Sequence, residues 1–257
     1  MKTLSIIQAR MGSSRLPGKV VMKLSGKPLL QHIVENLQHS ELTNQIIIAT
    51  TDLPEDNPIR DFSNSLGIKC FSGSSNDVLK RYYECAQFYD GDIIVRINGD
   101  SPLVDPTLTD YAIQTCIKNN CDYVSNVLHL TYPLGYNSGE VIPFRILKHL
   151  NYSREDSASR EHVTFHIRKE PENFKIQEIC APIKLRREKW RLTIDYKEDL
   201  ELMKKIFQKL YKPNSPIEYS TLVNFLDKNP SLMKINEKYA LNITKDNVNP
   251  IKDGLIK

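Results

Sequence analysis

Gln8-Ala9-Arg10-Met11-Gly12-Ser13-Ser14-Arg15-Leu16-Pro17-Gly18-Lys19 follows directly on a short apolar run near the start of the chain. That run, residues 4–7, predicts the first buried strand of an α/β domain. The stretch after it combines small residues, which let backbone N–H groups approach a ligand, with the cations Arg10, Arg15 and Lys19. Backbone donors and cations together are the chemistry of a polyphosphate-binding loop. We therefore expect Lys19, Arg10 and Arg15 to act on a bound polyphosphate.

The loop differs from two common nucleotide-binding loops. A Walker A loop has a shorter spacing between its glycines and a hydroxyl residue after its lysine, whereas here five residues separate Gly12 from Gly18 and Val20 follows Lys19. The stretch also lacks the G-x-G-x-x-G pattern of a dinucleotide turn. The sequence therefore predicts a nucleoside triphosphate that is bound in another way.

Strands and helices alternate along the first half of the chain. Continuous apolar runs predict strands, and apolar residues that recur every three or four positions predict helices. The expected strands are 4–7, 45–50, 68–71, 92–97 and 123–126, and the expected helices are 28–39, 57–66, 77–89 and 106–118. This order requires an α/β fold with a mostly parallel sheet flanked by helices and a ligand crevice at the carboxyl ends of the strands.

The alternation breaks between residues 132 and 187. This region is expected to contain a turn-rich loop at 133–139, helices at 143–151 and 159–169, and an extended segment at 174–183. A strand at 190–195 and a helix at 198–211 then resume the pattern. We therefore divide the chain into a domain at 1–212, with 132–187 inserted, and a C-terminal extension at 213–257 that holds one further short helix at 219–227.

Two aspartates follow predicted strands. Asp100 comes after the strand at 92–97, and Asp195 ends the strand at 190–195. Because the carboxyl ends of sheet strands share one edge, the fold can bring both to the crevice. Magnesium binds hard oxygens, typically one or two carboxylates with phosphate oxygens and waters. We expect Asp100 and Asp195 to bind Mg²⁺, although either could instead cap the helix that follows it.

Composition narrows the class of protein. The chain has 257 residues, of which 40% are hydrophobic and 26% charged, as in ordinary globular proteins. A net charge of +4 is compatible with an anionic substrate but too small to indicate nucleic acid. No leader or membrane span is evident, and five cysteines without a C-x-x-C pair are typical of reduced thiols. We expect a cytoplasmic protein that binds neither nucleic acid nor membrane.

The loop, continued into Ser25-Gly26-Lys27-Pro28-Leu29, resembles the signature of cytidylyltransferases that activate sugar acids (CMP-Kdo and CMP-sialate synthetases), and above all the spore-coat polysaccharide biosynthesis protein F family. N-G-D-x-P-L around Asp100 and T-x-D before Glu198 look like that family's metal-binding motifs. The resemblance implies a Rossmann-like, GT-A-like nucleotidyltransferase that forms homodimers and uses CTP and Mg²⁺. It assigns nucleotide binding to Gln8, Ala9, Arg10, Met11, Gly12, Ser13, Ser14, Arg15, Lys19, Asn98 and Gly99.

Two further motifs extend the resemblance. The D-V-L-x-R-Y segment lies beside the nucleobase in the family, which makes Ser72, Asp77 and Arg81 candidates for base or ribose contacts. A capped amphipathic helix explains that segment almost equally well. R-E-H-V-T and the E-V pair imply acceptor contacts by Arg160, His162 and Glu140. The residues before Glu140 depart from the family pattern, so the acceptor stays open.

These observations predict an Mg²⁺-dependent cytidylyltransferase that transfers CMP from CTP to a sugar acid or related small anionic acceptor, releasing pyrophosphate, in surface polysaccharide or glycan biosynthesis. A phosphate- or phosphonate-bearing acceptor would use the same donor site. A sugar-1-phosphate nucleotidylyltransferase using another NTP is an alternative, which the lack of G-G-x-G-T-R-L disfavours. A nucleotide-binding regulatory protein is the non-enzymatic alternative.

Overall fold

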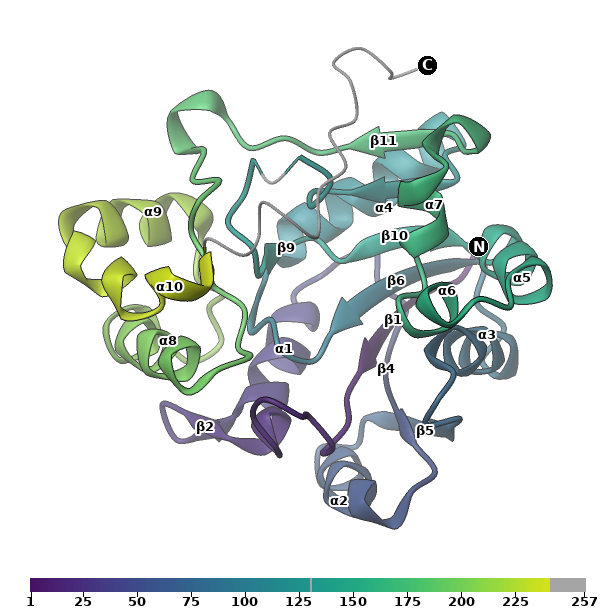
Figure 1. Cartoon of the computed structure of the whole chain (residues 1–257), viewed down its shortest axis with the longest axis horizontal. Coiled ribbons are helices and arrows are strands. Elements are labelled where there is room, and N and C mark those ends of the chain that lie inside the picture. The colour runs from purple at the N-terminus through teal and green to yellow at the C-terminus, as the bar shows by residue number, and fades with distance from the viewer. Residues whose placement is uncertain (130, 241–257) are drawn as a thin grey trace.

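The centre of the molecule is a seven-stranded sheet, seen in a computed structural model that describes residues 1–129 and 131–240. Its strands are β1 (Thr3–Gln8), β4 (Gln45–Thr51), β5 (Lys69–Gly73), β6 (Ile93–Asn98), β8 (Tyr123–Ser125), β10 (Glu140–Pro143) and β11 (Ile176–Glu178). They lie in the order β11-β8-β10-β6-β1-β4-β5 (Figure 1). β10 runs antiparallel to both neighbours, and every other pair is parallel. The predicted fold class, a mostly parallel α/β sheet flanked by helices, is confirmed.

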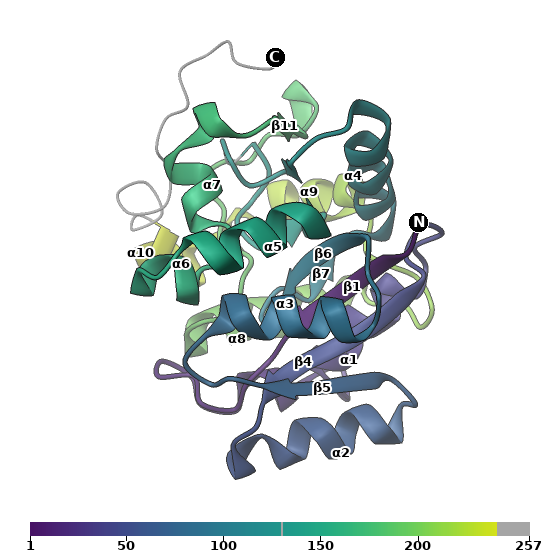
Figure 2. The same cartoon turned by 90° about the vertical axis from the view of Figure 1, so that its right-hand side faces the viewer.

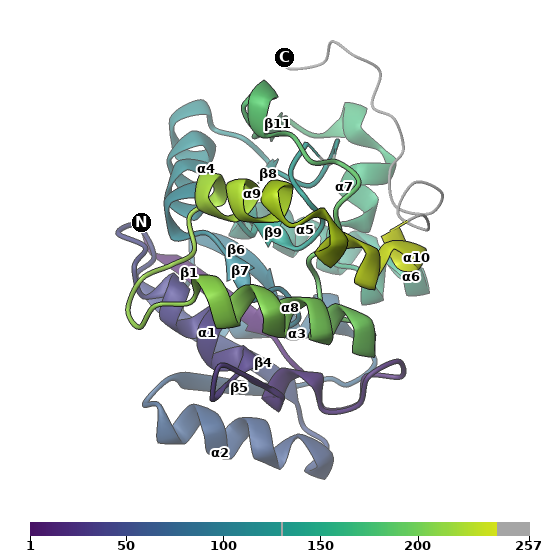
Figure 3. The ribbon, with the colours of Figure 1, turned by 90° about the vertical axis from the view of Figure 1, so that its left-hand side faces the viewer.

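Helices cover both faces of this sheet because its strands are apolar on both sides. In β1, Leu4 and Ile6 face one hydrophobic cluster and Ile7 faces the other. The first cluster contains α3 (Val78–Phe88), α5 (Phe144–Ser153) and α7 (Phe165–Lys169). The second contains α1 (Leu29–Leu37), α2 (Asn57–Ser65), α4 (Pro106–Asn119), α8 (Lys197–Leu210) and α9 (Tyr219–Lys228). Figure 2 shows α3 and α5 in front of the sheet, and Figure 3 shows α8 and α9 on its opposite side.

Shorter elements complete the described chain. They are β2 (Lys23–Leu24) with β3 (Lys27–Pro28), β7 (Leu103–Val104) with β9 (Tyr136–Asn137), α6 (Ser157–Glu161), α10 (Glu237–Ala240), and the 3₁₀ turns η1 (Lys19–Val21), η2 (Pro54–Asp56), η3 (Pro171–Asn173), η4 (Ile183–Leu185) and η5 (Pro230–Ile235). No helix within the described ranges has both the length and the apolar character needed to cross a bilayer. Part of the predicted C-terminal extension, residues 241–257, lies outside the described residues.

Two predicted elements are wrong. Residues 190–195 are not a strand of the main sheet; they make one isolated bridge, between Leu134 and Arg191. Leu192 and Ile194 are buried in the larger hydrophobic cluster, but Arg191 and Thr193 are buried as well, so the segment does not have the one buried face of an alternating strand. The predicted helix at 159–169 is two short helices, because Val163 between them has a φ of 26°, outside helical values.

The sequence analysis also missed a strand. β10 is only four residues long and ends at a proline, so it carries little periodic signal. It inserts between β6 and β8, and Glu140 pairs with Arg96 across the ladder. The inserted region thereby contributes a strand next to the one that precedes Asp100.

Candidate active site

A crevice of about 290 Å³ opens where β1 and β6 end side by side. Thirteen residues singled out from the sequence line it: Gln8, Ala9, Arg10, Ser13, Ser14, Arg15, Lys19, Arg81, Asn98, Gly99, Asp100, His162 and Asp195. The strand ends approach so closely that a Cβ on Gly99 would lie 2.5 Å from the carbonyl oxygen of Gln8. A glycine is therefore required at this position of the crevice floor.

The loop after β1 is anchored by a hydrogen bond to Asp56, and some of its backbone N–H groups remain available to a ligand. Asp56, fully buried in η2, accepts a 2.6 Å hydrogen bond from the backbone N–H of Met11. The Met11 carbonyl in turn accepts bonds of 2.9 Å each from the N–H groups of Ser13 and Gly18. Within the described residues, the backbone N–H groups of Gly12, Ser14 and Arg15 have no hydrogen-bond acceptor. Unpaired loop N–H groups next to cations suit an anionic ligand.

Lys19 joins the loop to the two predicted metal ligands. Gly18 has a φ of 68°, a left-handed conformation that glycine adopts without strain, and Lys19 begins η1 immediately after it. The Lys19 ammonium donates hydrogen bonds of 2.8 Å to Asp100 Oδ2, to Asp195 Oδ1 and to the backbone carbonyl of Ile194. The two aspartates, remote in sequence, therefore face one point in the crevice.

The charges around Lys19 stabilise its ionised state and that of Asp195. Burial would lower the pKa of Lys19, but Asp100 and Asp195 raise it above its usual value. Burial would raise the pKa of Asp195, but Lys19, Arg15 and Arg191 bring it below its usual value. At neutral pH the centre therefore holds an ammonium and ionised Asp195.

Asp195 is positioned by hydrogen bonds that replace the predicted sheet strand. The N–H of Ile194 donates to the Asp100 carbonyl at 3.0 Å, so the backbones that carry the two aspartates are directly joined. Arg191 Nη2 donates to Asp195 Oδ2 at 2.6 Å, and buried Asp199 accepts from the N–H of Asp195 at 2.9 Å. A Cβ on Gly135 would lie 2.3 Å from the nitrogen of Thr193, so this segment also needs a glycine against it.

Arginines surround the carboxylates. Arg15 lies 3.1 Å from Asp195 Oδ1 and over the ring of Tyr196, with 51% of its side chain exposed, and Arg10 is exposed at the mouth. Arg81 and Arg96 are buried and line the wall of the crevice. The lining thus carries more cationic than anionic side chains, which favours a polyphosphate.

Several predicted site residues do not line the crevice. Met11, Gly12, Ser72, Asp77, Glu140 and Arg160 are outside its lining. Asp77 caps α3 by accepting from the N–H of Lys80, and it also pairs with Arg160. These two residues, predicted to contact nucleotide and acceptor respectively, therefore hold α3 against α6.

Glu140 lies behind the crevice wall. It is 7% exposed, pairs with Arg96 and accepts hydrogen bonds from Tyr123 and Thr164. Burial would raise the pKa of Glu140, but the nearby cations lower it to about 2. Glu140, predicted to contact the acceptor, does not line the crevice but pairs with Arg96, which does.

Sequence reasoning missed four lining residues: Val20, Val78, Arg96 and Glu161. Arg96 had a usable signal, since a cation inside an otherwise apolar strand must find a buried partner. Asp56, which supports the loop from behind, had no local signal beyond its ordinary helix-start position. Asp199, which supports Asp195, lies in the stretch after T-x-D that resembles the family's second metal-binding motif, but its buried role was not predicted.

The chemistry of the aspartate pair fits a divalent cation. Asp100 and Asp195 converge on one position. Apart from Lys19, the Asp100 carboxylate accepts a hydrogen bond from just one of the residues that the structure describes, the hydroxyl of Ser101 at 3.2 Å. Mg²⁺ favours one or two carboxylates and completes its shell with phosphate oxygens and water. These two residues could hold Mg²⁺ in the presence of a triphosphate.

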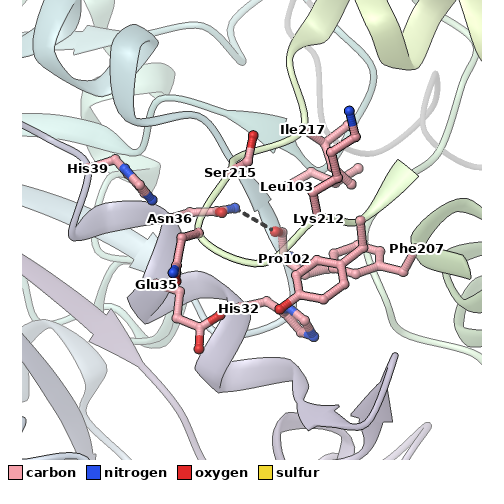
Figure 4. Close-up of a pocket in the computed structure, with 12 residues that line it drawn as sticks. His32, Glu35, Asn36, His39, Pro102, Leu103, Phe207, Lys212, Ser215 and Ile217 are labelled. Carbon is pink, nitrogen blue, oxygen red and sulfur yellow. Dashed lines mark hydrogen bonds between the residues drawn. The ribbon is translucent and has the colours of Figure 1, made fainter. Parts of the chain in front are cut away.

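A second hollow, shown in Figure 4, lies between α1 and the chain that follows α8. Its volume is about 20 Å³, and it shares no residue with the larger crevice. Asn36 at its wall donates to the Pro102 carbonyl at 3.1 Å. This space suits about one water molecule, so the crevice at Lys19 is the candidate active site.

Known proteins match this chain over most of its length. A sequence model of the cytidylyltransferase family matches residues 4–220. An uncharacterized protein of Methanocaldococcus jannaschii is 41% identical over 92% of this chain and 95% of that protein. The spore coat polysaccharide biosynthesis protein SpsF of Bacillus subtilis is 36% identical over 88% of this chain and 95% of that protein. The solved structure of a cytidylyltransferase from Leptospira borgpetersenii has a TM-score of 0.85 and 31% identity, covering 91% of this chain and 97% of that one.

Proposed function

The chain belongs to the cytidylyltransferase family, and we propose that it transfers CMP from CTP to a hydroxyl of a small anionic acceptor of the sugar-acid class. One observation carries the proposal: Lys19 lies between Asp100 and Asp195 directly beside a loop with unpaired backbone N–H groups. Binding donors, cations and paired carboxylates are the parts that nucleotidyl transfer from a triphosphate requires.

The reaction proceeds by in-line displacement. The hydroxyl oxygen of the acceptor forms a bond to the α-phosphorus of CTP and its proton passes to solvent water. The bond from that phosphorus to the bridging oxygen breaks, and pyrophosphate leaves with the electron pair. The N–H groups of the loop and Arg10 bind the triphosphate. Arg15 and Lys19 face the charge that develops on the departing pyrophosphate. Positioning and charge neutralisation supply the rate enhancement, and positioning alone can contribute roughly 7–11 kcal/mol.

Asp100 and Asp195 are the proposed Mg²⁺ ligands. When bound, the ion would neutralise phosphate charge and favour attack at phosphorus. Lys19 and Arg191 hold these carboxylates in place before a nucleotide arrives.

The acceptor is assigned by charge. Arg81 and Arg96 line the crevice wall, and His162 and Glu161 approach from the inserted region. Guanidinium groups bind carboxylates with two parallel hydrogen bonds, which suits the carboxylate of a sugar acid. The name of the Bacillus subtilis relative supports a role in polysaccharide biosynthesis.

We further propose a cytoplasmic homodimer. The cytoplasmic assignment is supported by five cysteines that form no disulfide. The homodimer rests on the family resemblance, and the molecular mass in solution, measured by light scattering, tests it.

Pyrophosphate release tests the function directly. The purified protein is mixed with each of four NTPs and a panel of sugar acids, sugar 1-phosphates and phosphonates, with Mg²⁺ or with EDTA. We expect release only with CTP, an anionic acceptor and Mg²⁺. Release with UTP, dTTP or GTP and a sugar 1-phosphate would identify the alternative enzyme class, and tight nucleotide binding without release would indicate a regulatory protein.

A further inference from the structure

Residues beyond the part of the chain that matches the family model (4–220) contact residues next to the active site. Residues 230–240, the C-terminal segment, comprise η5 and α10, and α10 lies beside α8 in Figure 1. We propose that Asn236 and Tyr239 of this segment are positioning residues for nucleotidyl transfer: Asn236 orients Asp195, and Tyr239 orients Arg15. This inference rests on the proposed function.

Asn236 is hydrogen-bonded to two of the residues that position Asp195, Asp199 and Arg191. Its side chain is almost fully buried, and its Nδ2 donates to Asp199 Oδ1 at 2.7 Å and to the Arg191 carbonyl at 2.9 Å. Asp199 accepts from the backbone N–H of Asp195, and Arg191 donates to the Asp195 carboxylate. Without Asn236, buried Asp199 loses a donor and Arg191 loses a backbone anchor. Partners of this kind behind a metal ligand determine its orientation.

Tyr239 contacts Tyr196, the residue that follows Asp195 in the chain. Its ring stacks on Tyr196 with centroids 3.7 Å apart and planes 1° apart. The guanidinium of Arg15 lies 5.2 Å from the centroid of the Tyr196 ring. Arg15 is half exposed and also pairs with Asp195 Oδ1 at 3.1 Å, so the Tyr196 side chain is one of two restraints on the position of its guanidinium. Tyr239 thereby holds the surface on which Arg15 rests.

The anchoring of the segment is separate from these contacts. Leu232, Met233 and Ile235 pack against the main hydrophobic cluster. Asn236 and Tyr239 instead contact Asp199, Arg191 and Tyr196, which are in contact with Asp195 and Arg15 of the crevice lining. Point substitutions at 236 and 239 can therefore test positioning while the apolar anchor remains.

The Asn236 arm of the test uses Asn236→Leu, with Asn229→Leu as its control. Asn229 belongs to the same extension, and among the described residues its side chain donates only to the Phe225 carbonyl, at 2.8 Å. We expect Asn236→Leu to lower kcat about 10–100-fold while the Kd for CTP in EDTA, measured by calorimetry, stays within about twofold, because the loop is intact. A kcat near the wild-type value, or an equal loss in Asn229→Leu, overturns this arm.

The Tyr239 arm separates phosphate binding from general destabilisation. Tyr239→Leu is expected to weaken metal-free CTP binding about three- to tenfold and to leave CMP binding unchanged, because CMP lacks the phosphates that Arg15 contacts. Tyr239→Phe keeps the stacked ring and should restore CTP affinity. Tyr111→Leu, on the exposed side of α4, is the matched control. Equal weakening of CTP and CMP, no weakening, or failure of Tyr239→Phe to rescue overturns the inference.

These variants test the positioning roles of Asn236 and Tyr239 separately from the proposed cytidylyl transfer. If Asn236→Leu does not fold, as thermal unfolding would show, the Tyr239 variants decide the proposal. A wild-type protein that neither binds CTP nor releases pyrophosphate refutes the proposed function. An active wild type with unaffected Asn236 and Tyr239 variants refutes only the inference about the C-terminal segment.

Discussion

Replacing Lys19 by methionine should destabilise the protein in a pH-dependent way. The Lys19 ammonium lies 2.8 Å from a carboxylate oxygen of Asp100 and 2.8 Å from one of Asp195, and 11% of its side chain is exposed. Methionine preserves the apolar stem but leaves two carboxylates facing each other. Removing one partner from a buried ionic cluster is far more costly than replacing the whole cluster.

The expected loss in the free energy of unfolding follows from the distance between the two carboxylates. The facing carboxylate oxygens are separated by at most twice 2.8 Å, and two like charges about 5 Å apart repel by roughly 3 kcal/mol at an effective dielectric constant of about 20. Solvent reaches Asp100, whose side chain is 25% exposed, and salt reduces the repulsion further. We expect a loss of about 2–3 kcal/mol in the free energy of unfolding at pH 7.

The pKa shifts of Asp195 and Lys19 determine how the stability difference between wild type and Lys19→Met changes with pH. In the wild type the pKa of Asp195 is lowered, so its stabilisation is present above the ordinary carboxyl pKa and is lost as the pH falls through the lower folded value. The pKa of Lys19 is raised, so its charge persists at all pH values below its ordinary pKa. In Lys19→Met the repulsion disappears once one carboxylate is protonated. The difference between wild type and variant should therefore be smaller at pH 4 than at pH 7, and it should close fully only as the pH falls through the lowered pKa of Asp195.

Urea unfolding in EDTA at pH 4 and pH 7 measures this difference. Lys27→Met is the control, because Lys27 forms a partly exposed pair with Glu35 at 2.7 Å, and such pairs contribute about 0–1 kcal/mol. A gap between wild type and Lys19→Met that is the same at both pH values, or no larger than that of Lys27→Met, would refute the electrostatic reasoning.

Three further predictions concern turnover. Asp100→Ala and Asp195→Ala should each abolish pyrophosphate release, while circular dichroism shows that the variants remain folded. Asp61→Ala, at an exposed position of α2, is the control and should release pyrophosphate normally. Near-normal activity in either crevice variant would contradict the metal assignment. Lys19→Ala should reduce kcat by about 10²–10³-fold, less than either aspartate variant, because it removes one donor to the transition state; an unchanged kcat with only a raised KM would exclude that role. Gly99→Ala should lower kcat/KM at least about tenfold and cost roughly 1–3 kcal/mol of stability, because its Cβ would meet a backbone oxygen at 2.5 Å; wild-type kinetics and an unchanged urea midpoint would show that the strand ends can separate.

Local pattern predicted much of the fold. Apolar runs located β1, β4 and β6, and three- or four-residue periodicity located helices such as α1 and α3. The loop after β1 and Asp100 after β6 were placed at one crevice, because parallel strands in the sheet end at the same edge. Each of these inferences uses residues that are close in sequence or a general rule of α/β topology.

Other features depended on contacts between remote residues. Asp195 was expected at the crevice for the wrong reason, since residues 190–195 do not join the main sheet and are held instead by Asp100, Arg191 and Asp199. No local pattern could show that Glu140 pairs with Arg96 in the interior, because that pair depends on a four-residue strand inserted between two others.

The chemistry of the loop, the α/β alternation and the family to which the chain belongs follow from the order of the residues. The tertiary structure alone decided which charged residues face the crevice, which are buried behind it, and that Asn236 and Tyr239 reach Asp199 and Tyr196 from the far end of the described chain. The physical reason is the distance along the chain over which each kind of interaction acts. Periodicity and turn chemistry act over a few residues, whereas burying a charge requires a partner that packing supplies from anywhere in the chain.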